Sequence, residues 1–588
     1  MTAGPAPRAG VAPRPRAAPR TTATAILEAL TDAGVSNLFA NFGSDHPALI
    51  EALAAARAHG RPVPTVITCP NEMVALSAAH GAALLTGRAE AVLVHVECGT
   101  QALAGAMHNA ARARVPVLIL AGLTPFTQEG ELPGSRNEFI HWLQDVPDQR
   151  GIVRGYVKYE NEIRSGRNAG EIIRRALQLA QSAPQGPVYL TVAREVLEER
   201  IPGPGDAGGG FPPLARVVPA GDDLAALVRD LTAAERPVVV TSYLGRNPEA
   251  VEELVALTGK LGIGVIESVP SAMNFPADDP AWLGVQWSEP RQNESLAEAD
   301  LVLVIESDVP WIPTVNRPGT GARIYHIDVD PLKERLPLWH IPAAASYRSD
   351  AASALAEINR RLANAALDDE RIGRRHAELR RRHAERARRL AEREATTGGE
   401  ITVEFAVAAL RAHLDADTIV LNEAITSYPL VVEHLGARPA GSVFASGGGA
   451  LGWHGGAAIG MKLAQPGKTL VAIVGDGTYL FSLPATVHWM ARRYRTPFLT
   501  IVLNNRGWRA PKLSMLALHP EGYASRANEL DIAFDPPPDY GAIAAAAGGA
   551  FAASVQLPEE MEPALQRAFH TVREEGRAAV LDVWLREF

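Results

Sequence analysis

The chain has 588 residues, of which 47% are hydrophobic and 21% charged; this composition excludes a disordered, collagen-like or coiled-coil protein and predicts about three or four globular domains. Its two cysteines, Cys69 and Cys98, are too few for a disulfide framework or a cysteine-rich zinc module, and they fit a reducing compartment. The net charge of −9 argues against nucleic acid as a partner, because such binding needs a basic surface.

The chain begins with a segment of unusual composition. Residues 1–20 are rich in proline, alanine, glycine and arginine and hold almost no large apolar side chain, so we predict a disordered tail. This tail lacks the apolar run of a secretory signal, and no stretch approaches the length of a membrane-spanning helix. We therefore expect a cytoplasmic protein without a membrane partner.

The apolar residues that follow fall into three segments, 21–200, 214–350 and 401–588. In each segment, short runs rich in valine, isoleucine and leucine alternate with alanine-rich helical patterns. Continuous apolar strands separated by helices indicate parallel sheets that are covered on both faces. We therefore predict an α/β protein with three doubly wound parallel-sheet domains, whose ligands lie beyond the carboxyl ends of the strands.

Two stretches separate these segments. Residues 201–213 are rich in glycine and proline and predict a linker. Residues 351–400 are predicted to form a charged helical linker, in which arginines and glutamates are interspersed. This stretch could be a nucleic-acid-binding helix or an exposed interdomain helix with Glu–Arg pairs, and the glutamates and the overall negative charge favour the second interpretation.

In the first segment one glutamate stands out by its position. Glu72 follows a predicted strand, opens an alanine-rich apolar helix, and is the only carboxylate between Glu51 and Glu90. A glutamate in the first turn of a helix is favoured by the helix dipole, so its position alone does not establish a catalytic function. Whether Glu72 is catalytic therefore depends on the motifs of the third segment.

The third segment carries a pattern that suits a metal and a phosphate. Gly475, Asp476 and Gly477 follow one apolar strand, and Asn504 and Asn505 end the next. Glycines let the backbone approach a phosphate closely, and aspartate and asparagine oxygens suit Mg²⁺, which binds a few protein oxygens together with substrate phosphate. A glycine turn with a helix-capping aspartate is the alternative.

Two further stretches of the third segment could also contact a phosphate-containing ligand. Thr426 and Ser427 follow a predicted strand, where hydroxyls and amides at a helix start could bind phosphate or could be plain helix caps. The glycine-rich loop 446–453 contains one bulky apolar residue, Leu451, which would otherwise be assigned to the core.

The aspartate between two glycines, followed by an asparagine pair at the end of the next strand, resembles the thiamine-diphosphate signature. From about residue 21 to the C-terminus the chain is similar to the thiamine-diphosphate-dependent superfamily, in particular to the benzoylformate decarboxylase and acetolactate synthase-like group. The resemblance implies thiamine diphosphate and Mg²⁺ as cofactors. It also names the three domains as pyrimidine-binding, central and diphosphate-binding.

The resemblance assigns three catalytic residues to the first segment. Glu72 matches the glutamate that bonds the aminopyrimidine ring of the cofactor and so activates it. Ser44 matches a serine that orients the carboxylate of a 2-oxo acid, and His95 matches a histidine that transfers protons.

The resemblance also assigns the residues that hold the cofactor. Asp476, the Asn505 side chain and the main-chain carbonyl of Gly507 match the metal ligands, and Leu451 matches the residue that wedges under the cofactor. The other implied cofactor-binding residues are Glu72, Thr426, Ser427, Gly449, Gly475, Gly477 and Thr478.

The chain departs from the decarboxylase pattern at one position, because Asp279 stands where a second histidine is expected in the central domain. His46 or His454 could compensate for this loss. Arg509 and Lys512 could hold a second anionic group of the substrate or could be exposed to solvent.

A flavin in the central domain, as acetolactate synthase relatives often hold, is left open. Residues 215–345 contain no clear dinucleotide fingerprint, and the single glycine turn at Gly245 is too little to indicate one. We therefore do not expect FAD, although the sequence does not exclude it.

The resemblance implies a thiamine-diphosphate- and Mg²⁺-dependent enzyme that decarboxylates a 2-oxo acid through an enamine intermediate and releases an aldehyde. The alternative is an acetolactate synthase-like carboligase, which transfers the acyl unit to a second carbonyl compound. A non-catalytic regulator or scaffold that has kept the fold is the rival of another class. We expect a homodimer or homotetramer in which Glu72 of one chain meets the diphosphate site of its neighbour.

Overall fold

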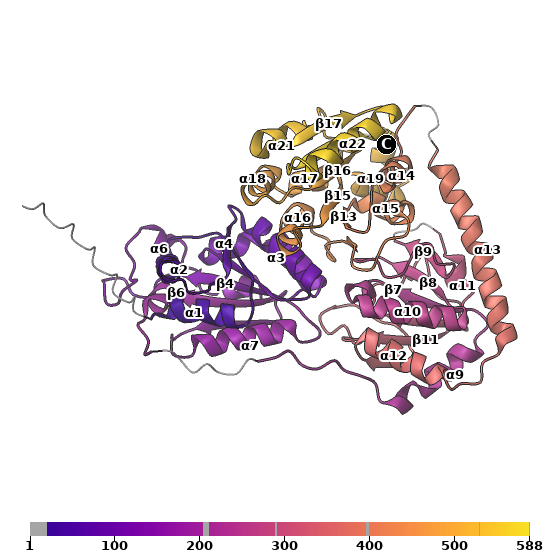
Figure 1. Cartoon of the computed structure of the whole chain (residues 1–588), viewed down its shortest axis with the longest axis horizontal. Helices are drawn as coiled ribbons and strands as arrows, with labels where there is room; N and C mark the ends of the chain where they lie inside the picture. The colour runs from indigo at the N-terminus through magenta and orange to yellow at the C-terminus, as the bar shows by residue number, and fades with distance from the viewer. Residues whose placement is uncertain (1–19, 204–210, 288–290, 396–398, 528–529, 587–588) are drawn as a thin grey trace, which may run out of the picture.

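We describe the protein from a computed structural model, which covers residues 20–203, 211–287, 291–395, 399–527 and 530–586. Nearly all of the predicted disordered tail and residues 204–210 of the predicted linker lie outside the described residues. The chain folds into three domains, each built on a six-stranded parallel sheet flanked by helices (Figure 1). This confirms the predicted α/β architecture of three doubly wound domains.

The N-terminal domain has the strand order β2-β1-β3-β4-β6-β5. Its strands are β1 (Asn37–Ala40), β2 (Thr65–Thr68), β3 (Glu90–Val94), β4 (Val117–Leu123), β5 (Tyr159–Ile163) and β6 (Val188–Ala193). Its helices are α1 (Thr22–Asp32), α2 (Pro47–Ala58), α3 (Glu72–Thr86), α4 (Val96–Ala102), α5 (Ala104–Arg112), α6 (Ile140–Leu143), η1 (Arg150–Ile152), α7 (Ala169–Gln181) and α8 (Arg194–Glu198). Strands β3, β4 and β6 are buried along nearly their whole length, as expected for a sheet covered on both faces.

The central domain has the strand order β12-β11-β10-β7-β8-β9, which is the dinucleotide-fold order with its switch point between β7 and β10. Its strands are β7 (Pro237–Thr241), β8 (Gly264–Ser268), β9 (Trp282–Gln286), β10 (Leu301–Ile305), β11 (Arg323–Asp328) and β12 (Ala345–Arg348). Its helices are η2 (Gly221–Leu224), α9 (Ala225–Ala233), η3 (Leu244–Arg246), α10 (Pro248–Leu261), α11 (Glu294–Ala297) and α12 (Ala351–Leu362).

The C-terminal domain repeats the strand order of the N-terminal one, as β14-β13-β15-β16-β18-β17. Its strands are β13 (Thr418–Glu423), β14 (Val443–Phe444), β15 (Thr469–Gly475), β16 (Leu499–Asn504), β17 (Phe551–Val555) and β18 (Ala579–Trp584). Its helices are α14 (Val403–Arg411), η4 (Ile425–Ser427), α15 (Tyr428–Leu435), α16 (Trp453–Ala464), α17 (Asp476–Phe481), α18 (Pro484–Tyr494), α19 (Arg509–Leu518), α20 (Tyr523–Ala527), α21 (Tyr540–Gly548) and α22 (Pro558–Arg573).

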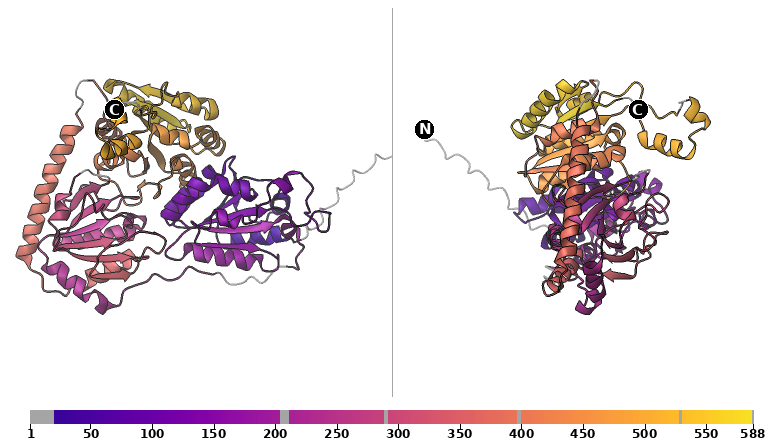
Figure 2. Two further views of the ribbon diagram at one scale, coloured as in Figure 1. Left: turned by 180° about the vertical axis from the view of Figure 1, so that it is seen from behind. Right: turned by 90° about the vertical axis from the view of Figure 1, so that its right-hand side faces the viewer.

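The charged stretch between the central and C-terminal domains forms α13 (Asp369–Arg393), which runs along the side of both domains (Figure 2). Ion pairs four residues apart, such as Arg374–Glu370 and Arg382–Glu378, join successive turns of the helix, and Arg382 also pairs with Glu298 of the central domain. The buried Arg375 donates to the carbonyl of Leu261 and so joins the helix to the central domain.

The linker is shorter than predicted at its N-terminal end. Helix α12 was expected to be part of it, but Leu355, Ile358 and Leu362 of that helix are buried in the central hydrophobic core. The reason is the apolar face of α12, which the central sheet covers. Among the described residues, no helix is both long and apolar enough to span a bilayer.

The N- and C-terminal domains share one hydrophobic cluster, whereas the central domain has its own. The shared cluster forms where α3 crosses α16 (Figure 1). A Cβ atom at Gly460 would overlap the backbone of Ala78, and one at Gly81 would overlap the backbone of Ala457. The two helices can therefore approach this closely only because the crossing is built from small residues.

Candidate functional site

Three neighbouring strands of the N-terminal sheet deliver the predicted catalytic residues to one edge. Ser44 lies in the loop after β1, Glu72 opens α3 after β2, and His95 follows β3 directly. Because β2, β1 and β3 are adjacent and parallel, their carboxyl ends meet at the same edge of the sheet. The structure therefore brings these three predicted residues into one cluster.

Glu72 is held at the start of α3 by its neighbours. The side chain of Asn71 caps the helix by accepting from the amide of Val74. The Glu72 carboxylate is half-buried and accepts a hydrogen bond of 2.8 Å from the amide nitrogen of Asn41. One carboxylate oxygen is thus anchored in place at the edge of the site.

His95 forms a buried pair with Asp45, a residue that the sequence analysis did not identify. His95 Nδ1 lies 2.6 Å from Asp45 Oδ1, and the amide of Val96 donates to Asp45 Oδ2 at 3.1 Å. Burial lowers the pKa of His95, but the hydrogen bond and charge of Asp45 outweigh it, so the pKa is raised above its ordinary value. The only sequence signal for Asp45 is that it follows Ser44 directly.

Two glycines make room for this pair. A Cβ atom at Gly43 would overlap the ring of His95, and one at Gly122 would overlap the carboxylate of Asp45. Burial raises the pKa of Asp45, but the neighbouring His46 and His95 outweigh it and hold the pKa below its ordinary value. The carboxylate therefore stays charged and keeps the proton of His95 on Nδ1.

The segment after β4 returns to the same edge and adds two side chains that the sequence analysis missed. His141 Nε2 lies 3.3 Å from Ser44 Oγ, and the Gln144 amide lies 2.5 Å from His95 Nε2. No motif marks either residue, because α6 is only four residues long and the segment around it is irregular.

In the C-terminal domain, the side chain of Asn505 approaches two oxygens. The amide atom that faces them lies 3.2 Å from Asp476 Oδ2 and 2.7 Å from the carbonyl oxygen of Gly507. With its nitrogen there, the amide donates to both; with its oxygen there, three oxygens converge with no proton between them. The second arrangement is a donor set for a hard cation such as Mg²⁺, so the three predicted ligands fit the metal.

Asp476 itself is buried at the start of α17. Its carboxylate accepts from the amides of Gly477, at 2.7 Å, and Gly507, at 3.0 Å. Burial raises the pKa of Asp476, and these amides oppose the increase. In the described part of the chain there is no group of three or more His, Cys, Asp or Glu side chains that could hold a metal, so this single carboxylate with an amide and a carbonyl is the candidate.

The loop that carries Leu451 is held by the N-terminal domain of the same chain. The amide of Gly449 donates to His108 Nε2 at 3.0 Å. Asn109 accepts from the amide of Ala450 at 3.1 Å and donates to its carbonyl at 2.8 Å. Leu451 then lines a cavity of about 540 Å³ between the three domains, together with Asn422, Ile425 and Trp287.

The remaining predicted cofactor residues lie around these two features. Thr426 and Ser427 belong to η4, Gly475 ends β15, and Thr478 is buried in α17. Gly477 must be glycine here, because a Cβ atom would overlap the ring of Trp508.

The residues proposed to replace the missing histidine are not available for that role. His46 is fully buried, and its Nδ1 accepts from the amide of Gly43. His454 is buried against Glu423, whose carboxylate also accepts from the amide of Trp453 and so holds the start of α16. Both histidines are structural. Asp279 lies in the loop before β9 and caps it by accepting from the amide of Ala281.

Arg509 and Lys512 are both partly buried in α19, which contacts η4. Burial lowers the pKa of Arg509. They lie beside η4, which carries the predicted cofactor residues Thr426 and Ser427. That they bind a second anionic group of the substrate stays a prediction.

The predicted site consists of two half-sites, one around Glu72 in the N-terminal domain and one around Asp476 in the C-terminal domain. In the part of the chain that the structure describes, no hydrogen bond or ion pair joins Glu72 to a residue of the C-terminal domain. Instead, α3 contacts α16 through residues further along the helix, where the rings of His80 and Trp453 lie 5.3 Å apart. Within one chain, α3 therefore meets the C-terminal domain by packing against α16, without a hydrogen bond or ion pair from Glu72 among the described residues.

Three family models of thiamine pyrophosphate enzymes match the chain, one in each domain. The N-terminal thiamine pyrophosphate binding domain matches residues 20–152, and the central domain matches residues 224–358. The C-terminal thiamine pyrophosphate binding domain matches residues 424–583.

The chain is also similar to curated proteins along most of its length. It is 25% identical over 548 residues to the protein named "Probable 2-ketoarginine decarboxylase" of Pseudomonas aeruginosa, covering 92% of this chain and 90% of that one. It is 25% identical over 491 residues to benzoylformate decarboxylase of the same species, covering 82% and 86%. It is 26% identical over 503 residues to the chloroplastic acetolactate synthase 1 of Oryza sativa subsp. japonica, covering 82% and 72%.

A solved structure shares the whole architecture. The thiamine diphosphate-dependent 4-hydroxybenzoylformate decarboxylase of Rhodococcus jostii RHA1 superposes with a TM-score of 0.77 at 20% identity, covering 97% of this chain and 99% of that one. At this identity the likeness shows the fold alone.

Proposed function

Since the chain belongs to the thiamine pyrophosphate enzyme family, with its binding domains at both ends, we propose that it uses thiamine diphosphate and Mg²⁺ to decarboxylate a 2-oxo acid and release an aldehyde. The observation that carries the proposal is the cluster of Ser44, Glu72 and the Asp45–His95 pair at one edge of the N-terminal sheet. This cluster combines an anion-binding hydroxyl, a carboxylate and a proton-transfer histidine.

When bound, thiamine diphosphate supplies a nucleophilic carbon and a cationic ring that accepts the electrons left by carbon dioxide. Asn41 anchors one carboxylate oxygen of Glu72. The other oxygen would then accept a hydrogen bond from the pyrimidine ring of the cofactor and hold a proton there. Asp476, Asn505 and the carbonyl of Gly507 would hold Mg²⁺ against the diphosphate.

The groups around Ser44 and His95 suit the substrate. The Ser44 hydroxyl would donate to the carboxylate of the 2-oxo acid. His95 keeps one proton on Nδ1 for Asp45, and its Nε2, which lies 2.5 Å from the Gln144 amide, would exchange a proton with the substrate when that amide gives way. The raised pKa of His95 favours the charged form that a proton donor needs.

We propose further that the complete site forms between two chains. It is supported by the lack of a hydrogen bond or ion pair between Glu72 and the C-terminal domain among the described residues of one chain. Large apolar side chains are exposed near both half-sites: Phe126, Phe139, Trp142 and Leu143 near the N-terminal one, and Phe481, Trp489, Leu518 and Tyr523 on the C-terminal domain. A second copy would cover such surfaces.

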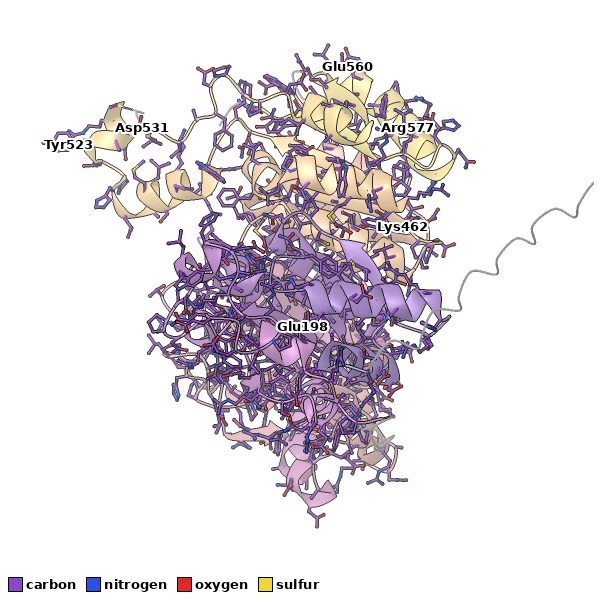
Figure 3. All side chains as sticks on the ribbon, turned by 90° about the vertical axis from the view of Figure 1, so that its left-hand side faces the viewer. Glu198, Lys462, Tyr523, Asp531, Glu560 and Arg577 are labelled. Carbon is purple, nitrogen blue, oxygen red and sulfur yellow. The ribbon has the colours of Figure 1, made fainter. Side chains whose placement is uncertain are left out.

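The C-terminal domain also carries an arm that reaches away from the body of the chain. Figure 3 shows Tyr523 and Asp531 on this projection, and Tyr523 is 90% exposed. A protruding arm with exposed Leu513 and Leu518 is typical of a segment that packs against a partner, which supports a dimer or tetramer.

The two cysteines support a cytoplasmic location. Cys69 is buried, Cys98 is exposed, and neither is paired. Burial raises the pKa of the Cys69 thiol, which makes it unreactive. An exposed free thiol persists best in a reducing compartment.

An acetolactate synthase-like carboligase is the second candidate. Its support is the similarity to acetolactate synthase and the aspartate at position 279 in place of a second proton-donating histidine. The rival without catalysis, a regulator or scaffold, predicts loss of the acid and metal residues, yet Glu72, Asp476 and Asn505 are all present.

The test is to incubate the purified, cofactor-loaded protein with a panel of 2-oxo acids, with and without aldehyde acceptors, and to measure carbon dioxide and products. Release of an aldehyde supports the decarboxylase, and a new carbon–carbon bond with an acceptor supports the carboligase. Carbon dioxide from no 2-oxo acid, together with no rise in melting temperature on adding thiamine diphosphate and Mg²⁺, would refute both.

A further inference from the structure

The segment between β4 and η1 reaches back across the strand-end cluster. Residues 137–144, which we call the clamp, include α6 and place His141 and Gln144 inward with only 2% and 6% of their surface exposed. Phe139 and Leu143 of the same stretch point outward, with 77% and 74% exposed. The clamp therefore buries His141 and Gln144 while Phe139 and Leu143 are exposed, which for these four side chains is the reverse of ordinary packing.

Contacts with the body of the domain hold the clamp in place. Arg194 donates to the side-chain oxygen of Asn137 at 2.8 Å, and Thr124 donates to the backbone carbonyl of Gln144 at 3.3 Å. Just beyond the clamp, Gln149 donates to the carbonyl of Gly122 at 2.9 Å. These contacts fix both ends, so the inward side chains have defined positions.

The hydrogen bonds of His141 determine which nitrogen carries its proton. The amide of Asn137 donates to Nδ1 at 3.3 Å, so Nδ1 is an acceptor and we assign the proton of the neutral ring to Nε2, although Nη1 of Arg194, itself a donor, lies 3.5 Å from that nitrogen. Burial lowers the pKa of His141, and the positive charge of Arg194 lowers it further, so the ring is neutral. Arg136 acts in the same direction, while Glu138 and Asp45 oppose it.

This tautomer sets the direction of the Ser44 hydroxyl. Since Nε2–H of His141 faces Ser44 Oγ at 3.3 Å, Oγ accepts from the ring. The proton of the hydroxyl is then left to point elsewhere, and it is available as a donor to an incoming carboxylate. A serine without this partner could turn its proton toward any acceptor nearby.

Gln144 does the same for His95 from the side opposite Asp45. His95 is bonded to Asp45 at Nδ1 and to the Gln144 amide at Nε2, so its ring is held in one plane. An amide offers both a donor and an acceptor, so by turning over it can bond the neutral and the protonated ring alike. A carboxylate or a lysine at this position would stabilise only one of the two forms.

We propose that His141 and Gln144 are positioning residues of the decarboxylation site, His141 for the Ser44 hydroxyl and Gln144 for the His95 ring. This proposal rests on the proposed function, because it assumes that Ser44 and His95 act on the substrate. Asp279 stands where a second histidine was expected in the central domain. In this protein a second histidine, His141, comes from the N-terminal domain instead.

The proposal is tested with two double-mutant cycles in the full-length holoenzyme. H141L is expected to lower kcat/KM for the best 2-oxo acid by about tenfold or more, as loss of an oriented hydrogen bond does. H141Q, whose amide can donate from the place of Nε2, should recover most of that loss. In an S44A background, H141L should cost less than about twofold, because its effect passes through Ser44.

The second cycle uses Q144M, which keeps the length of the side chain and removes its hydrogen bonds. It should lower kcat by about tenfold with little change in KM, and it should have little further effect in an H95A background. H59Q, on the exposed end of α2, is the matched control and should behave as wild type. If H141L costs as much without Ser44 as with it, or Q144M as much without His95, the clamp is structural only and the proposal is wrong.

A measurement without cofactor or turnover keeps the two proposals apart. In protein labelled with ¹⁵N-histidine, the signal that disappears in H141Q should have the shifts of a neutral ring protonated on Nε2. A ring protonated on Nδ1, or a charged ring at neutral pH, would overturn the assignment whatever the enzyme's activity. If the tautomer is as expected but no 2-oxo acid is decarboxylated, the proposed function fails and the roles assigned to His141 and Gln144 fail with it.

Discussion

Charged and polar groups gather at the carboxyl ends of the strands in both the N-terminal and the central domain, but the two edges differ in how those groups are satisfied. In the central domain, Lys333 donates at 2.6 Å to each of Tyr243, Asp308 and Asp328. Arg114 of the N-terminal domain adds an ion pair of 3.0 Å to Asp308. The Lys333 side chain is only 1% exposed, so this edge is closed by the protein's own charges.

In the N-terminal domain the corresponding edge is left open. Glu72 and Ser44 are half-buried, and 20% of the His95 side chain is exposed although it is bonded on both sides. The comparison teaches that the same position in the same kind of sheet can either join two domains or leave titratable side chains partly exposed. The two edges differ in the partner of their carboxylates. Lys333 and Arg114 neutralise Asp308 and Asp328 in the central domain, whereas a histidine that can titrate pairs with Asp45 in the N-terminal domain.

The largest expected effect comes from removing the carboxylate at the open edge. E72Q should lower kcat/KM by about 100-fold to 10,000-fold, the range of positioned acid–base groups, and should change the free energy of unfolding by less than about 1 kcal/mol. Steady-state kinetics and urea unfolding measure the two quantities. A variant that unfolds easily but keeps its activity would reverse the distinction between the edges.

At the closed edge the opposite result is expected. K333M leaves Asp308 and Asp328 with Arg114 as their remaining buried cation and should lower the free energy of unfolding by up to about 3–5 kcal/mol. The activity of the molecules that remain folded should stay near that of wild type. Denaturant unfolding with K468M, which removes an exposed lysine paired with Asp417, serves as the control.

A smaller effect is expected from replacing Asp45, and it should depend on pH because Asp45 is paired with a histidine. Because Asp45 raises the pKa of His95, their interaction stabilises the fold below the usual histidine pKa and is lost as the pH rises through the raised value. D45N should therefore lose more stability at about pH 6 than at about pH 9. The limb of the kcat/KM profile that reports His95 should move to lower pH, and an unchanged limb would exclude Asp45 as its partner.

The smallest expected effect is none at all. At the switch point of the central sheet, where a dinucleotide fold takes its ligand, Tyr243 is bonded to Asp308 and Ser242 to Ser307, so these polar groups are already satisfied, although Ser242, Tyr243 and Asp308 line the interdomain cavity. FAD should therefore shift the melting temperature by less than about 1 °C, whereas thiamine diphosphate with Mg²⁺ should raise it clearly. A comparable shift with FAD would mean that this edge opens.

Much of the fold could be predicted because strands and helices follow from the pattern of apolar residues along short stretches of the chain. Apolar runs such as β10 and β15 are buried along nearly their whole length, which a parallel sheet between helices requires. The boundary at α12 could not be predicted from composition, because its apolar face looks like any amphipathic helix until the central core that covers it is known.

Part of the candidate site could be predicted for the same reason. Asp476 and Asn505 stand at the ends of adjacent strands, so strand order alone brings them together. His46 and His454 were wrong as substitutes for the missing histidine, because the sequence shows that a side chain can titrate but not whether it is buried against Gly43 or Glu423.

By itself, the sequence determined the three sheets, the position of Glu72 at a helix start and the meeting of Asp476 and Asn505 at the ends of neighbouring strands, because each depends on residues close together in the chain or on adjacent strands. Only the tertiary structure decided that Asp45 would pair with His95 and that His141 and Gln144 would lie against Ser44 and His95. These partners lie 49 to 97 residues apart in the chain, and a contact over such a distance is set by how the loops close over the sheet.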